Sequence, residues 1–282
     1  MASGFIRNRT ILAIAALTVV LSSISGLQAG DRFITIASTT STRNSGLYDH
    51  ILPLFTNETG IKVRVVAVGT GQAIKIAQNG DADALFVHHK PSEDKFVTAG
   101  YGLKRLDVMY NDFLLVGPKF DPARVAGSKD IIAALTKIAK TGHPFASRGD
   151  DSGTHKIELG LWKVSRNDPR KSSRGWYRET GSGMGATLNT ASAMNAYTLT
   201  DRGTWLKFSN KGELQVVVEG DDRLFNPYGI IVVNPAQHPH VKRADAEAFA
   251  NWLVSKSGQT AIGAYRIKGK QAFFPNAHNP ND

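Results

Sequence analysis

Cysteine is absent from this chain of 282 residues. Disulfide bonds, thiolate catalysis and cysteine-ligated zinc sites are therefore excluded. Basic residues outnumber acidic ones and give a formal net charge of +10, but no block of five or six consecutive lysines and arginines occurs. Internal repeats and low-complexity tracts are also absent. Scattered positive charge of this kind indicates a general attraction for anions and does not predict a nucleic-acid-binding surface.

Long apolar runs are absent apart from one near the N-terminus. Arg7 and Arg9 precede the apolar run at residues 11–21, and small residues then lead to Ala29. The run is too short to span a bilayer but has the length of the apolar part of a secretory signal. The sequence therefore predicts a signal peptide over residues 1–29, cleavage near Ala29 and a soluble, periplasmic mature protein. An uncleaved membrane anchor is the alternative.

From residue 33 onward, strand-like segments alternate with helix-like segments. Strands are predicted over residues 33–37, 62–68, 84–88 and 113–116, with helices between them over residues 46–59, 72–78 and 92–99. Glycines at the ends of these helices support the bounds. A β-α-β-α-β order of this kind is typical of a parallel sheet flanked by helices.

A second unit begins near residue 114. The remaining predicted elements are helices over residues 129–140, 186–198 and 244–254 and strands over residues 214–218 and 228–235. The last strand and helix return to the first unit, which predicts an α/β fold of two lobes, each a mainly parallel sheet flanked by helices, joined by two crossovers. We assign lobe 1 to residues 30–113 and 228–282 and lobe 2 to residues 114–227. Ligands of open α/β sheets bind at the carboxyl ends of the strands.

Three predicted strand-to-helix turns are rich in hydroxyl groups. They carry Thr-Thr-Ser-Thr at residues 39–42, Gly-Thr-Gly at residues 69–71 and Ser-Arg-Gly-Asp-Asp-Ser-Gly-Thr at residues 147–154. Each turn alone is also explained as an ordinary helix cap. Together they offer what a buried dianion requires, because hydroxyls and backbone N–H groups donate hydrogen bonds without adding charge and Arg148 adds charge-assisted bonds. The sequence therefore predicts a site for a small oxyanion, with Arg148 as its principal cation.

In combination, these motifs resemble those of the tungstate-binding proteins of ABC importers. The resemblance includes Asp-Ala-Asp at residues 81–83, Gly-Met-Gly-Ala-Thr-Leu at residues 183–188 and Tyr-Thr-Leu-Thr-Asp-Arg-Gly-Thr at residues 197–204, and it extends to about residue 275. It implies a two-lobed periplasmic binding protein of type II that closes on an oxyanion between its lobes. Such a protein is not an enzyme and delivers its anion to a membrane permease and its ATPase. We expect a monomer without a cofactor or a bound metal cation.

The resemblance also implies which residues contact the anion. The implied contacts are seven hydroxyl-bearing residues and one arginine: Thr39, Thr40, Ser41 and Thr70 from lobe 1, and Ser147, Arg148, Ser152 and Thr154 from lobe 2. Arg202 is a secondary candidate, with Asp201 as its expected structural partner. Tungstate and molybdate are nearly the same size, so geometry separates them poorly and either is an expected ligand.

A phosphate-binding protein of the same fold is the nearest alternative. Such proteins have a loop of similar spacing, which Arg148, Asp150, Ser152 and Thr154 keep. Phosphate near neutral pH carries a proton, so its site benefits from a carboxylate acceptor. Tungstate and molybdate are unprotonated at that pH, and a carboxylate that faced them would repel them. The tungstate interpretation therefore requires Asp150 to turn away from the anion and to orient Arg148 by an ion pair.

A hydrolase and a metal-binding protein are two further alternatives to the binding protein. Ser152, His155 and an aspartate at residue 150 or 151 are the residue types of a hydrolase triad, but they share one short segment, and the Gly-x-Ser-x-Gly motif is absent. Histidines at residues 88–89 and 238–240 could suggest a metal site. Adjacent residues of a strand face opposite sides, however, and zinc normally needs three or four converging ligands.

Overall fold

The computed structural model of the chain describes residue 1 and residues 32–172 and 175–277. The predicted signal peptide therefore lies outside the described residues, apart from residue 1. Within the described ranges, no helix is long and apolar enough to cross a membrane.

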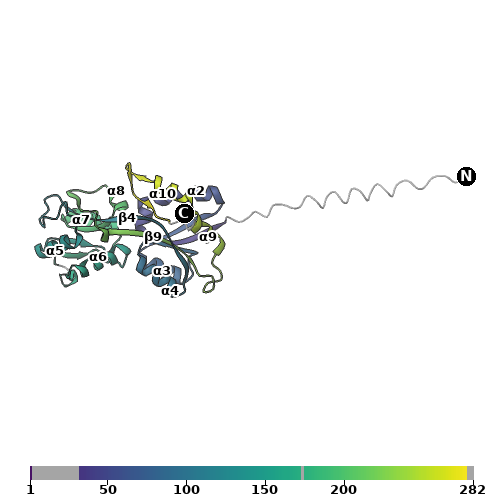
Figure 1. The fold of residues 1–282 in the computed structure, drawn as a ribbon, viewed down its shortest axis with the longest axis horizontal. Coiled ribbons are helices and arrows are strands. Elements are labelled where there is room, and N and C mark those ends of the chain that lie inside the picture. The colour runs from purple at the N-terminus through teal and green to yellow at the C-terminus, as the bar shows by residue number, and fades with distance from the viewer. Residues whose placement is uncertain (2–31, 173–174, 278–282) are drawn as a thin grey trace. The chain divides into compact units, whose positions relative to one another are not determined.

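Two long strands connect the lobes and run antiparallel through the middle of the molecule (Figure 1). They are β4 (Gly102–Pro118) and β9 (Phe225–Val233). Asn111 of β4 lies opposite Asn226 of β9 in the register. The two crossovers predicted between the lobes are therefore neighbouring strands of one sheet.

Strand β4 begins well before the predicted strand at residues 113–116, so that prediction of its start was wrong. Charged residues in its first half obscured the pattern of a strand. Arg105 of this half is nevertheless largely buried, because it forms ion pairs with Glu93 and Asp107. Paired charges of this kind can be buried in a sheet where an unpaired charge could not.

The first lobe is built on a sheet with the strand order β12-β4-β9-β3-β1-β2. Its other strands are β1 (Phe33–Thr39), β2 (Lys62–Val68), β3 (Ala84–Val87) and β12 (Phe274–Pro275). Its helices are α1 (Thr40–Ser45), α2 (Leu47–Thr59), α3 (Thr70–Gln78), α4 (Lys90–Thr98), α9 (Arg243–Val254) and α10 (Lys256–Ala264), and a short hairpin follows, β10 (Arg266–Ile267) and β11 (Lys270–Gln271). Strand β1 pairs in parallel with β2 and β3, whereas β9 and β4 add antiparallel pairs.

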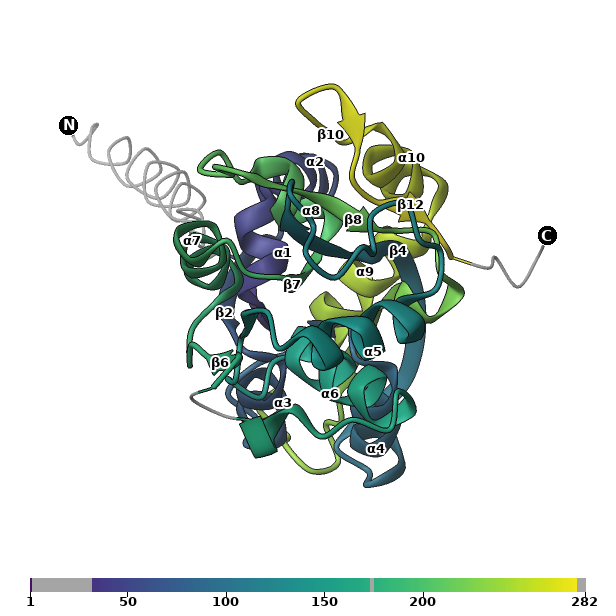
Figure 2. The same ribbon diagram turned by 90° about the vertical axis from the view of Figure 1, so that its left-hand side faces the viewer.

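The second lobe gathers the elements between β4 and β9. Its strands are β5 (Phe145–Ser147), β6 (Tyr177–Glu179), β7 (Thr198–Asp201) and β8 (Leu214–Val218), and its helices are α5 (Ile131–Thr141), α6 (Gly153–Val164), α7 (Met184–Met194) and α8 (Arg202–Lys207), with 3-10 turns η1 (Pro169–Ser172) and η2 (Asp222–Leu224). Strands β7 and β8 pair antiparallel with β4, and β5 pairs in parallel with β6. Helices α5 and α6 pack against each other (Figure 2).

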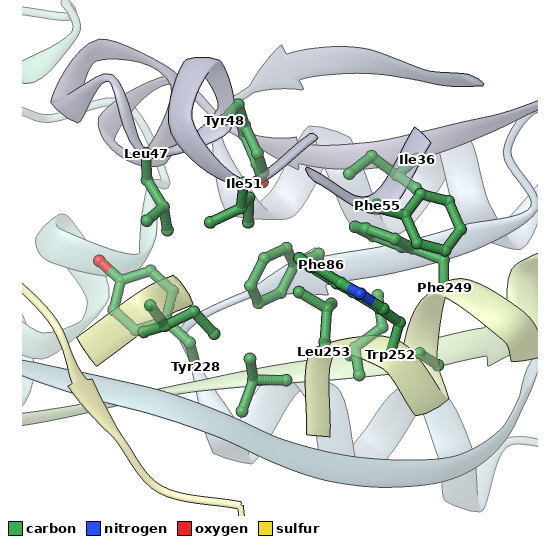
Figure 3. Close-up of a cluster of buried hydrophobic side chains, with 14 of the residues drawn as sticks. Ile36, Leu47, Tyr48, Ile51, Phe55, Phe86, Tyr228, Phe249, Trp252 and Leu253 are labelled. Atoms are coloured by element: carbon green, nitrogen blue, oxygen red, sulfur yellow. The ribbon is translucent and has the colours of Figure 1, made fainter. Parts of the chain in front are cut away.

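An aromatic core fixes the first lobe around the sheet (Figure 3). The ring of Phe55 on α2 lies 5.0 Å from that of Phe249 and 5.6 Å from that of Trp252, both on α9. Phe86 of β3 packs edge-on against Tyr228 of β9 at 6.4 Å. These rings are almost fully buried, and each contributes on the order of 1.5–3 kcal/mol through burial. These contacts pack α2 against α9 and β3 against β9, while the strand pairing sets the register of β1, β2 and β3.

That register aligns the carboxyl ends of three strands at one edge of the sheet. Thr39 at the end of β1 pairs with Val68 at the end of β2, and Ser38 pairs with Phe86 near the end of β3. The residues that follow these strands are therefore neighbours. This is the edge at which ligands of α/β sheets bind.

Candidate anion-binding site

Arg148 lies between β5 and α6, where Asp150 holds its guanidinium. The side chain of Arg148 is 3% exposed, and its Nε and Nη2 donate to Oδ2 of Asp150 at 3.2 and 2.6 Å. The other carboxylate oxygen, Oδ1, accepts from the backbone N–H of Ser152 at 3.2 Å. Three of about four lone-pair positions of this carboxylate are thus occupied within its own loop. Asp150 orients Arg148 by an ion pair, as the tungstate interpretation requires.

Thr39 ends β1 and caps α1. Its Oγ1 accepts from the backbone N–H of Thr42 at 3.4 Å and lies 3.1 Å from Oγ of Ser41. Thr39 and Ser41 are buried, and Thr40 is half-buried at the first position of α1. The sequence predicted a helix only from residue 46, because runs of serine and threonine have low helix propensity. The cap at Thr39 stabilises this earlier helical turn.

Thr70 and Gly153 join the two lobes. Thr70 begins α3 and is fully buried, and its Oγ1 accepts from the backbone N–H of Gly153, the first residue of α6, at 3.0 Å. The carboxylate of Asp151 also lies against this turn, since a Cβ on Gly71 would lie 2.3 Å from its Oδ2. The N-termini of α3 and α6, both with partial positive charge, meet at this contact.

Ser147, Ser152 and Thr154 are all buried, but their hydroxyls have different roles. Ser147 ends β5 and donates to Oε2 of Glu158 at 2.8 Å. Oγ of Ser152 caps α6 by accepting from the backbone N–H of His155 at 3.2 Å. Oγ1 of Thr154 is buried without a hydrogen-bond partner. Unpartnered buried hydroxyls are rare in proteins, so the hydroxyl of Thr154 is an unused hydrogen-bond donor near the start of α6.

Glu158 links Ser147 to the interior of the second lobe. Its Oε1 accepts from the Tyr177 hydroxyl at 2.7 Å and from Nε1 of Trp162 at 3.2 Å. Burial raises the pKa of Glu158 to about 7, although the hydrogen bonds from Tyr177, Ser147 and Trp162 act in the opposite direction. A carboxyl that titrates near neutral pH is therefore bonded to the residue that precedes Arg148.

His88 belongs to this cluster, although it was not among the predicted anion contacts. It follows β3 directly and is 2% exposed. Its Nε2 lies 3.2 Å from Oγ of Ser41, and its Nδ1 lies 3.0 Å from Oδ1 of Asn226. A Cβ on Gly153 would lie 3.2 Å from Cε1 of this ring. The available signal was its position, because a polar residue directly after a fully buried strand occupies the ligand edge of the sheet.

Burial lowers the pKa of His88. The positive charge of Arg148 acts in the same direction, whereas Asp201 and the hydrogen bond with Asn226 act in the opposite direction. The neighbouring His89 contacts Ser92 instead, and burial followed by the charge of Lys156 lowers the pKa of His89 to about 4. Both histidines of the adjacent pair therefore have a pKa below the ordinary value.

Arg202 binds two carboxylates outside this cluster. It donates to both oxygens of Asp112 at 2.5 and 2.6 Å and to Glu219 at 2.8 Å. The expected pairing with Asp201 was wrong, because Asp201 caps α8 and accepts from the backbone N–H and the hydroxyl of Thr204 at 2.8 and 2.6 Å. Arg202 therefore links the start of α8 to β4 and to the residue that follows β8.

The remaining polar motifs make local hydrogen bonds. Nδ1 of His155 accepts from the backbone N–H of Asp151 at 3.1 Å, and its Nε2 is buried without a partner, so the imidazole is not bonded to the hydroxyl of Ser152 as a hydrolase triad would require. His238 and His240 donate from Nε2 to carbonyl groups at the end of α3, at 2.8 and 2.9 Å. Among the described residues, no group of three histidine, aspartate or glutamate side chains could hold a metal ion.

The chain matches a known protein family and individual relatives over most of its length. The PBP superfamily domain matches residues 27–257. The chain is 48% identical, over 86% of each chain, to the tungstate-binding protein TupA of Peptoclostridium acidaminophilum. It is 45% identical to a putative ABC transporter anion-binding protein of Haloferax volcanii, with 91% of this chain and 76% of that protein covered.

Two solved structures have the same fold as this chain. The tungstate-binding protein TupA from Desulfovibrio alaskensis superimposes with a TM-score of 0.77 at 47% identity, and the alignment covers 88% of this chain and all of that chain. The tungstate ABC transporter protein from Geobacter sulfurreducens gives a TM-score of 0.76 at 47% identity, with 83% of this chain and 98% of that chain covered.

The contact between Gly153 and the first lobe gives a first prediction. A Cβ on Gly153 would lie 3.0 Å from Oγ1 of Thr70 and 3.2 Å from Cε1 of His88, so these two side chains of the first lobe would have to give way by a few tenths of an ångström. We expect Gly153→Ala to weaken oxyanion binding by about tenfold, or about 1.4 kcal/mol, in a calorimetric titration.

Gly160→Ala is the matched control, because Gly160 lies on the same helix and a Cβ there would meet nothing within 4 Å. This control should keep the affinity and should raise the free energy of unfolding by about 0.5–1 kcal/mol. Equal affinities in the two variants would contradict the proposed closeness of the lobes at Gly153.

The raised pKa of Glu158 gives a second prediction, for Glu158→Gln. The pKa is about 7 in the folded protein and 4.5 as the ordinary value. The resulting stabilisation is present below about pH 4.5 and is lost as the pH rises through 7. The free energy of unfolding of the wild type, relative to Glu158→Gln, should therefore fall by about 1–3 kcal/mol from pH 5 to pH 8 in urea titrations.

Glu213→Gln is the control, because it makes the same change of carboxylate to amide at an exposed site. The free energy of unfolding of the wild type, relative to Glu158→Gln, could instead stay constant or rise with pH. That result would show that burial does not raise the pKa of Glu158.

Proposed function

The chain belongs to the PBP superfamily and, within it, to the family of tungstate-binding proteins, and from this membership we propose that it captures tungstate or molybdate between its two lobes. The mechanism is capture without chemical conversion of the ligand. Hydroxyls and backbone N–H groups replace the water shell of the anion, and Arg148 supplies positive charge. The contacts are proposed to be Thr39, Thr40, Ser41 and Thr70 from one lobe, and Ser147, Arg148, Ser152 and Thr154 from the other.

The engagement of Asp150 is the observation that carries the choice of anion. Its Oδ2 accepts hydrogen bonds from Arg148, and its Oδ1 accepts one from the backbone N–H of Ser152. This carboxylate therefore supports the cation and has little capacity left to accept the proton of hydrogen phosphate. A proton-free dianion suits such a site better than phosphate does.

Delivery to an ABC importer completes the proposal. We infer that the lobes, divided at residues 113 and 228, close by bending of β4 and β9 and present the loaded protein to a membrane permease and its ATPase. The protein would act as a monomer in the periplasm after removal of a signal peptide near Ala29. It would need no cofactor and would have no enzymatic activity.

A thermal-shift panel tests the function directly. A ligand that binds only the folded state stabilises it by about 2.7 kcal/mol at one hundred times its dissociation constant. Tungstate and molybdate should therefore raise the melting temperature by several degrees at micromolar concentrations, and sulfate and phosphate should do so only weakly. A larger shift with phosphate than with tungstate would favour the phosphate-binding alternative.

Arg148→Ala should weaken tungstate binding by about 2–5 kcal/mol, because it removes a buried charged partner and leaves Asp150 unpaired. Calorimetry with tungstate measures the loss. Arg223→Ala is the matched control, since Arg223 also donates through Nε and Nη2 to a nearby aspartate, Asp221, at 2.8 and 2.6 Å, but on the exposed surface. Unchanged binding in Arg148→Ala would remove Arg148 from the site.

A further inference from the structure

A chain of buried polar side chains leads from the connecting strands to the anion site. Nδ2 of Asn226 donates to Oδ1 of Asn111 across the β4–β9 pair at 2.6 Å. Oδ1 of Asn226 lies 3.0 Å from Nδ1 of His88, and Nε2 of His88 lies 3.2 Å from Oγ of Ser41. All four side chains belong to residues that are at most 2% exposed. Hydrogen positions in this chain are therefore set by its members and not by solvent.

The asparagine pair determines which ring nitrogen of His88 carries a hydrogen. With the amides oriented as they are in the structure, Nδ2 of Asn226 donates to Asn111, and its Oδ1 faces the ring and can only accept. In this arrangement Nδ1 of His88 is the donor. In the neutral ring Nε2 is then an acceptor, and it takes the hydroxyl hydrogen of Ser41. In the protonated ring Nε2 is a donor, and Ser41 accepts from it.

These two states have opposite consequences for a proton-free anion. A serine hydroxyl has one hydrogen to donate. With a neutral His88, that hydrogen points to Nε2 and Oγ presents only lone pairs, which repel an oxyanion. With a protonated His88, Ser41 accepts from Nε2 and its own hydrogen is free for the anion. The donor set around Ser41 is therefore complete only when His88 is protonated.

We propose that His88 is a positioning residue for Ser41 and that it takes up one proton from solvent when the dianion binds, so that capture of tungstate is coupled to protonation. This inference rests on the proposed function. The step is a simple protonation of the ring, with no covalent bond broken and no transfer to the anion. It predicts tighter binding at lower pH.

The surroundings of His88 are consistent with such a change of state. Asp201 favours the protonated ring, whereas burial and Arg148 oppose it, and His89 also lies nearby. The anion would add two negative charges to this balance. The ring stacks on Tyr228 at 4.7 Å and lies 6.4 Å from Phe113, so its orientation is fixed while its charge changes.

Calorimetry in buffers of different ionisation enthalpy counts the protons that are taken up. We expect a value approaching one proton per tungstate at pH 7.5 for the wild type. The tungstate dissociation constant should rise by up to about tenfold per pH unit between pH 7 and pH 8.5, as linkage requires. In His88→Gln, which keeps an uncharged polar group, both the uptake and the pH dependence should disappear.

His89→Gln is the matched control and should keep the proton uptake of the wild type, because His89 contacts Ser92 and not Ser41. Tight tungstate binding without proton uptake in the wild type, or uptake that persists in His88→Gln, would overturn the inference but not the proposed function. Absence of any tungstate binding by the wild type would overturn both.

The wild type alone gives an independent test if His88→Gln does not fold. In protein labelled with nitrogen-15 at histidine, the Nε2 resonance of His88 should move from the position of an unprotonated ring nitrogen to that of a protonated one when tungstate is added. A resonance that keeps its unprotonated position in the complex would contradict the proposal.

Discussion

The ion pair between Arg148 and Asp150 is the interaction on which the candidate site depends. A buried guanidinium without a partner would destabilise the protein before any ligand arrives, and a buried carboxylate without a partner would repel the ligand. Pairing within one loop solves both problems, because Asp150 gives the guanidinium a partner while Ser152 and Arg148 occupy the oxygens of Asp150. The cation is thus held in place in the free protein.

The aligned strand ends bring the candidate residues of the first lobe together. The register of β1, β2 and β3 places Thr39, Thr70 and His88 at one edge of the sheet, and α6 of the second lobe contacts that edge through Gly153. A buried polar group without a partner costs about 1–3 kcal/mol. The unpartnered hydroxyl of Thr154 is therefore a cost that a bound anion would remove. Donors fixed by the fold lose little further freedom on binding.

Much of this arrangement could be predicted from the sequence, since hydroxyl runs after apolar strands indicate which edge of the sheet carries the candidate site, although the early start of α1 at Thr40 was missed. The orientation of Asp150 was required by the tungstate interpretation, and the structure agrees with it. Three features could not be predicted. The first half of β4 was obscured by charges that are paired in three dimensions, the partner of Arg202 lies 90 positions away at Asp112, and the role of His88 depends on Asn226, which is 138 positions away. Short-range patterns carry no information on such contacts.

A crystal structure of the protein with tungstate tests the central claim most directly, because anomalous scattering locates the tungsten atom without reference to the protein. The account predicts the anion between the lobes, with its oxygens within hydrogen-bond distance of the Arg148 guanidinium and Oγ1 of Thr154, and with Asp150 still paired to Arg148. Tungsten at another position, or an oxygen of Asp150 in direct contact with the anion, would contradict it.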